Sequence, residues 1–156
     1  MPRRAMLVLA LTIVALSGCD RAPSGEVAAR PRVGLAIRTA AGTSHAFRVE
    51  RAVTEAEQRE GLMFRGTLPD DGGMLFAPYP ADGGKARIAS FWMKDTPSPL
   101  DIIFIAADGT IDSMAENTAP YTQTPVSSIG PVTAVLELRG GRAAELGLAE
   151  GDRVTW

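Results

Sequence analysis

Apolar and polar residues alternate over short stretches of this chain, and clusters of glycine, proline and aspartate separate the stretches. This pattern is typical of short β-strands joined by tight turns. Residues 33–37 and 47–49 place apolar side chains at every second position, and the Ala41-Gly42-Thr43 segment between them is typical of a turn. We therefore predict a β-hairpin at the start of the domain.

Three more strands are predicted in the middle of the chain and are expected to form the centre of the sheet. Residues 88–94 are strand-like, residues 100–106 are apolar and β-branched, and Asp108-Gly109 favours a type I′ turn into residues 111–114. Prolines at 97 and 99 predict a rigid loop between the first two of these strands. Shorter strands are expected at residues 74–76, at residues 133–138 and around Val154.

Helical signals are few. Thr54 and Glu57 form a capping-box pattern, and good helix formers follow until Gly61. A second short helix is expected at residues 142–146, after Gly140-Gly141. The fold class is thus mainly β: a compact antiparallel β sandwich or a partly open barrel, with one or two short helices.

The first residues are typical of a signal peptide. Arg3 and Arg4 precede an apolar stretch, residues 5–18, which spans roughly 21 Å as a helix and is shorter than the roughly 30 Å of a bilayer core. Leu16-Ser17-Gly18-Cys19 resembles the bacterial lipobox, in which the cysteine carries lipid. We expect a signal peptide at 1–18, lipidation at Cys19, a flexible tether at 19–32 and a single β-rich domain at 33–156.

This leader predicts that the domain lies in the bacterial cell envelope, lipid-anchored and facing the periplasm. Its expected partners are the lipid bilayer, through acylation of Cys19, and an unknown small ligand or envelope protein. Asp20 is similar to the signal that retains lipoproteins at the inner membrane in some enteric bacteria, while the outer membrane remains the alternative.

Composition excludes several kinds of chemistry. Sixteen Lys and Arg residues against eighteen Asp and Glu give a net charge of −2 without a basic cluster, so nucleic acid is not an expected partner. Cys19 is the sole cysteine, which excludes a disulfide or thiol catalysis within the domain. The methionines show no metal-binding spacing, and His45, the sole histidine, is expected to be solvated beside a turn. We expect neither a metal nor a cofactor.

Candidate binding residues gather where predicted strands end. Trp92 offers a flat apolar face, Lys94 is a donor, and Asp101 is an acceptor that would meet Lys94 if the two strands are neighbours. The alternative interpretation places Trp92 in the core and uses the charged pair to anchor the loop. The full candidate set is Arg65, Trp92, Lys94, Asp95, Thr96 and Asp101.

Several blocks of the sequence resemble the family called domain of unknown function 192. The blocks are Gly61-Leu62-Met63-Phe64-Arg65, Gly73-Met74-Leu75-Phe76, Phe91-Trp92-Met93-Lys94, Pro99-Leu100-Asp101-Ile102-Ile103-Phe104, Leu136-Glu137-Leu138 and Gly151-Asp152. The resemblance covers residues 33–156 and implies a compact β sandwich with short helices, often secreted or lipid-anchored, whose function is not established. Asp95 and Pro97 depart from the family, which commonly has asparagine followed by an aliphatic residue there.

An enzyme would draw on the carboxylates Asp101, Glu137 and Asp152, with Arg65 or Lys94 for electrostatic stabilisation. Simpler roles compete with this interpretation. Glu137 lies in an apolar strand, where an internal ion pair with a residue such as Arg65 would satisfy it. Asp152 follows Gly151 in a turn, where a carboxylate bonds nearby backbone N–H groups.

Three functions remain open, in this order. The first is a membrane-tethered module that binds a small ligand or partner in a cleft formed by residues 61–65, residues 92–96 and Asp101. The second is a hydrolytic enzyme that uses carboxylates in a cleft. The third is an envelope assembly or interaction protein with a flat apolar patch and no deep pocket.

Overall fold

The structure is a computed structural model that describes residues 30–156. The predicted signal peptide, Cys19 and the tether up to residue 29 lie outside the described residues. Within residues 30–156, no helix is long and apolar enough to cross a membrane.

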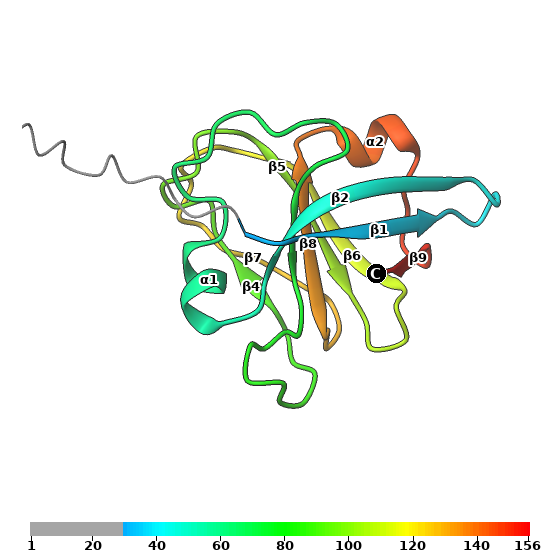
Figure 1. Cartoon of the computed structure of the whole chain (residues 1–156), viewed down its shortest axis with the longest axis horizontal. Helices are drawn as coiled ribbons and strands as arrows, with labels where there is room; N and C mark the ends of the chain where they lie inside the picture. The colour runs from blue at the N-terminus through cyan, green and yellow to red at the C-terminus, as the bar shows by residue number, and fades with distance from the viewer. Residues whose placement is uncertain (1–29) are drawn as a thin grey trace, which may run out of the picture.

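A curled seven-stranded sheet forms a half barrel and dominates the fold (Figure 1). Its strands run in the order β6-β5-β8-β3-β2-β1-β9, and all neighbours are antiparallel except β2 and β3. Their bounds are β1 Arg32–Arg38, β2 Ser44–Ala52, β3 Met74–Phe76, β5 Leu100–Ile105, β6 Ile111–Thr118, β8 Ala134–Arg139 and β9 Arg153–Thr155. Only two short helices accompany the strands in the described chain, α1 Glu55–Glu60 and α2 Arg142–Leu146. The mainly β fold class predicted from the sequence is confirmed.

The local signals in the sequence explain several elements. The alternation of apolar residues produces the β1–β2 hairpin, in which Leu35 is paired with Phe47. Thr54 caps α1 as predicted: its hydroxyl accepts from the Glu57 N–H, and the Glu57 carboxylate accepts from the Thr54 N–H. Gly109 has a φ of 85°, which allows the tight turn between β5 and β6.

The predicted central strand at residues 88–94 is wrong in length and position. Only β4, Ser90–Phe91, is extended, and it pairs with β7, Val126–Ser127, in a separate two-stranded sheet. The Met93 N–H bonds the Thr122 carbonyl, and the Thr96 N–H bonds back to Met93, so the chain turns instead of continuing as a strand. The neighbours of β5 in the large sheet are therefore β6 and β8.

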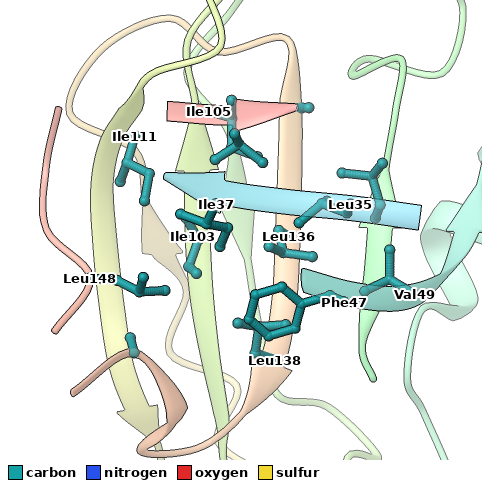
Figure 2. Close-up of a cluster of buried hydrophobic side chains, with 14 of the residues drawn as sticks. Leu35, Ile37, Phe47, Val49, Ile103, Ile105, Ile111, Leu136, Leu138 and Leu148 are labelled. Carbon is teal, nitrogen blue, oxygen red and sulfur yellow. The ribbon is translucent and has the colours of Figure 1, made fainter. Parts of the chain in front are cut away.

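Two hydrophobic clusters cover the two faces of the large sheet. The first fills the concave side of the curl with side chains from all seven strands, including Ile37, Ile103 and Leu136 (Figure 2). The second lies on the opposite face and includes Met74 and Ile102. Because successive strand residues face opposite sides, β8 contributes Leu136 and Leu138 to the first cluster and turns Glu137 toward the second.

Candidate functional site

A cavity of about 370 Å³ opens on the side of the second cluster. The helix α1 forms one wall, the Tyr79–Asp82 loop and Arg87 form another, and the segment from Ser90 to Thr96 completes the rim. The cavity is lined by Glu55, Gln58, Arg59, Glu60, Gly61, Leu62, Met63, Phe76, Tyr79, Pro80, Ala81, Asp82, Arg87, Ser90, Phe91, Trp92, Lys94, Thr96 and Glu137.

Glu137 contributes a carboxyl group to the inner wall of this cavity. Its cross-strand partners are Met74 on β3 and Ile102 on β5, both of which belong to the second hydrophobic cluster. The side chain is buried, and its Oε2 atom has no hydrogen-bond partner among the described residues. Burial raises the pKa of Glu137 to about 8, because the apolar surroundings disfavour the charged carboxylate.

The predicted ion pair between Glu137 and Arg65 is wrong. Arg65 binds Glu50 instead, with 3.0 Å between Nη2 and Oε2. Glu50, Met74 and Glu137 form one row across β2, β3 and β8, so Glu137 lies two strands, or roughly 10 Å, beyond Glu50. Arg65 therefore satisfies the nearer carboxylate and leaves Glu137 without a cationic partner.

Three of the predicted binding residues meet at the cavity. Trp92, Lys94 and Thr96 all line it, and 48% of the surface of Trp92 is exposed. The Lys94 ammonium lies 5.6 Å from the centre of the Trp92 ring, a cation–π arrangement. The Thr96 hydroxyl donates to the Lys94 carbonyl and holds the turn in place.

The other three predicted residues lie elsewhere. Asp101 is fully buried, and its carboxylate accepts the backbone N–H groups of Asn117, Gly141 and Ala143. It fixes the end of β6 and the start of α2, and it makes no ion pair with Lys94. Arg65 lines a separate hollow with Glu50, while Asp95 offers its backbone carbonyl to the Phe64 N–H.

Sequence reasoning missed the aromatic wall of the cavity. The Phe91 ring packs edge-on against Phe76, with centroids 5.0 Å apart, and lies 5.7 Å from the Tyr79 ring. The Arg87 guanidinium lies 5.5 Å from the centre of the Tyr79 ring. The pairing of β4 with β7 brings Phe91 to this wall, and no local pattern in the sequence predicts that pairing.

Two further predictions about polar residues have different outcomes. Asp152 accepts the backbone N–H groups of Ala40 and Ala149, which confirms its structural role. His45 is not simply solvated, because it is half-buried and its Nε2 atom is enclosed without a partner among residues 30–156. No group of three or more His, Cys, Asp or Glu side chains in that range is arranged to hold a metal ion.

Two solved structures are similar to this one. A protein of unknown function from Novosphingobium aromaticivorans DSM 12444 is 44% identical, with a TM-score of 0.77 over 84% of this chain and 89% of that chain. A "putative transcription regulator" from Sinorhizobium meliloti 1021 is 38% identical, with a TM-score of 0.76 over 81% of this chain and 95% of that chain.

No curated protein matches the sequence significantly. The family model DUF192, described as "Uncharacterized ACR", matches residues 36–156, which is most of the chain and nearly all of the described part. The chain therefore belongs to the DUF192 family, as the sequence blocks predicted.

Proposed function

We propose that this chain is a small-ligand-binding protein of the bacterial cell envelope, and that the cavity beside Glu137 is its binding site. The unpartnered Glu137 carboxyl carries the proposal. A buried polar atom without a hydrogen bond costs about 1–3 kcal/mol, so a protein that retains one gains free energy when a ligand supplies the missing partner.

The chemistry of Glu137 defines what the ligand must bring. Its raised pKa, about 8, keeps the carboxyl mostly protonated at neutral pH. The neutral group can donate one hydrogen bond and accept others, so it suits a ligand hydroxyl. A ligand ammonium would instead lower the pKa of the carboxyl. The carboxyl would then release its proton to the solvent and form an ion pair with the ammonium in the cavity. Both ligand types share one requirement: a hydrogen-bond donor that reaches past the aromatic wall.

The remaining walls suit the body of such a ligand. Trp92 presents a half-exposed ring at the rim, on which the flat apolar face of a sugar or a short alkyl chain can pack. Lys94 and Arg87 are exposed and make no ion pair within the described residues, so they remain available to polar groups of the ligand. We expect a small polar molecule with one apolar face.

The envelope location is the part of this proposal that rests on the sequence alone. The lipobox-like segment ending at Cys19 supports lipid anchoring of the mature chain. Arg30, the first described residue, is buried and binds Glu60 of α1 with 2.7 Å between Nη2 and Oε2. Because Glu60 also lines the cavity, the tether would join the domain beside the binding site.

A hydrolase is the second candidate, since a protonated carboxyl in an apolar pocket has the properties of a general acid. Glu55, Glu60 and Asp82 line the same cavity and would be the partners of Glu137 in such chemistry. The carboxylates Asp101 and Asp152 do not line it and are occupied by backbone N–H groups. Product formation from a bound ligand would favour this candidate over simple binding.

Transcriptional regulation, suggested by the description of the S. meliloti protein, finds less support here. A DNA-binding surface needs clustered cations that are available to phosphates. The net charge of this chain is −2, and Arg30, Arg65, Arg139 and Arg142 are each paired with a carboxylate.

Ligand titration of the full chain, read by Trp92 fluorescence in a Trp156→Phe background, tests the binding proposal. Glucose, glucosamine and putrescine serve as probes, because they present hydroxyl groups, both groups and ammonium groups respectively. We expect at least one probe to change the fluorescence, and Glu137→Leu, which removes both carboxyl oxygens, to weaken its binding by about tenfold or more, the equivalent of one hydrogen bond. Glu116→Gln, which changes an exposed glutamate on β6, should leave binding unchanged. Equal binding by all variants, or no binding of any probe, would contradict the proposal.

A further inference from the structure

Three neighbouring loops hold non-glycine residues in the left-handed backbone region. The φ angles are 61° for Phe64, 54° for Asp95 and 59° for Tyr121. Backbone hydrogen bonds tie the loops together: the Phe64 N–H donates to Asp95 at 2.7 Å, and the Tyr121 N–H donates to Thr96 at 3.1 Å. Such strained conformations persist only where the surrounding structure imposes them.

These loops present aromatic side chains to the outside. Phe64 is 76% exposed, Tyr121 is 62% exposed, and Trp92, on the loop between them, is 48% exposed. We call these three residues the aromatic edge. Large aromatic side chains normally bury much of their surface, so a set of them on linked loops indicates a surface that meets an apolar partner.

Arginines adjoin the aromatic edge. Arg65 follows Phe64 in the chain and lines a hollow of about 180 Å³ together with Arg32, Arg48 and Glu50. Glu50 neutralises Arg65, whereas Arg32 and Arg48 are exposed and make no ion pair within residues 30–156. The hollow therefore carries an excess of positive charge, which favours an anionic partner.

The chain enters the domain at this same edge. An Nη1 hydrogen bond of 3.2 Å joins Arg30 to the carbonyl of Gly61, three residues before Phe64. Ten residues, 20–29, separate Arg30 from Cys19. Ten residues reach at most roughly 36 Å even when fully extended, so a lipid on Cys19 would keep the aromatic edge within that distance of the bilayer.

We propose that the aromatic edge docks into the headgroup region of the bilayer, with Arg32 and Arg48 facing anionic lipid headgroups. This inference rests on the proposed membrane anchoring and not on ligand binding in the cavity. Trp92 and Tyr121 suit the membrane interface because their rings can lie in the apolar part while the indole N–H and the phenol O–H stay hydrated, and Phe64 adds apolar surface. Arginines beside them are attracted to the negative surface potential of anionic lipids. Docking would fix the orientation of the domain relative to the bilayer.

Depth-dependent fluorescence quenching tests this docking. The reporter is Phe64→Trp in a full chain that also carries Trp92→Phe and Trp156→Phe. It is reconstituted in phosphatidylcholine–phosphatidylserine vesicles with brominated acyl chains. Because the apolar leader at residues 5–18 would hold the full chain on the bilayer even without a lipid on Cys19, the test does not depend on lipid attachment.

A matched control is available in Ile129→Trp, made in the same background. Ile129 is 76% exposed, as Phe64 is, but its N–H is bound by Asp112 near the start of β6, whereas Tyr121 follows the end of that strand. We expect the bromines to quench the reporter at position 64 at least about twice as strongly as the one at 129. Equal quenching at the two positions, or none at either, would overturn the proposal.

The contribution of the charges of Arg32 and Arg48 to membrane docking is measured separately. Arg32→Ser with Arg48→Ser should reduce the quenching at position 64 in vesicles that contain phosphatidylserine and leave it unchanged in pure phosphatidylcholine. Millimolar inorganic phosphate should not reverse the quenching, because headgroups are held in the bilayer that the rings enter. Reversal by phosphate would identify a free-anion site and overturn docking. If docking fails while Glu137 still controls ligand binding, the proposed function stands.

Discussion

Replacing Glu137 with glutamine removes a titratable proton and keeps the shape of the side chain. In the native protein the carboxyl lies between Met74 and Ile102, where burial raises its pKa from 4.5 to about 8. The amide of glutamine is neutral at every pH, so burying it costs about as much free energy as burying the protonated acid. The variant therefore isolates the cost of placing a negative charge in this cavity.

The sign of the effect follows from proton binding. Between pH 4.5 and 8 the folded protein keeps the Glu137 proton while the unfolded chain has lost it, so the free energy of unfolding falls as the pH rises. The slope is about 1.4 kcal/mol per pH unit, which gives a loss on the order of 4 kcal/mol between pH 5 and pH 8. Below pH 4.5 both states are protonated, and the penalty disappears.

Urea denaturation of the wild type and of Glu137→Gln at pH 5, 6, 7 and 8 measures this loss. The remaining ionisable groups are the same in both proteins, so their contributions cancel in the difference. The two proteins should be almost equally stable at pH 5, and the glutamine variant should be the more stable by a few kcal/mol at pH 8. Glu116→Gln should follow the wild type throughout. A difference between wild type and Glu137→Gln that does not change with pH would refute the reasoning, because it would mean that Glu137 is solvated or paired.

Three further substitutions test how the site is held, each by urea denaturation followed by circular dichroism. Gly73→Ala should destabilise the fold by roughly 2 kcal/mol or more, because a Cβ there would collide with the backbone carbonyl of Glu137; a neutral result would mean that the strands can separate at little cost. Asp101→Ala should cost roughly 3 kcal/mol, since three backbone N–H groups, one of them buried, lose their acceptor, and a loss below 1 kcal/mol would contradict its structural role. Thr54→Ala should cost about 1 kcal/mol through the lost capping box with Glu57, whereas an unchanged midpoint would show that the cap is dispensable.

Local sequence patterns predicted much of the fold. The alternation around Leu35 and Phe47 defined a hairpin, and the capping box at Thr54 defined a helix start, because each signal lies within a few residues of the structure it specifies. The placement of β4 was missed because its partner β7 lies 35 residues further along the chain, and pairing at that distance leaves no periodic trace.

In the candidate site, too, the features set by neighbouring residues were predicted, and those set by distant strand pairing were not. Trp92, Lys94 and Thr96 were predicted together because they lie on one short segment, and the structure brings them to one cavity. Glu137 was misread because its isolation depends on a row that crosses three strands, in which Arg65 reaches Glu50 first. An isolated glutamate in an apolar strand was the available signal, and its partner could not be identified without the sheet order.

Infrared difference spectroscopy tests the central claim most directly, namely that Glu137 offers an unpaired, protonated carboxyl to a ligand. The carbonyl stretch of that group is identified at pH 6 as the band that Glu137→Gln removes. Glucose, glucosamine or putrescine is then added at saturation, according to which of them changes Trp92 fluorescence. A bound hydroxyl should shift the band, and a bound ammonium should remove it as the acid ionises. A band that stays unchanged while the ligand is bound, or that is absent from the free protein, would contradict the assignment of this cavity as the binding site.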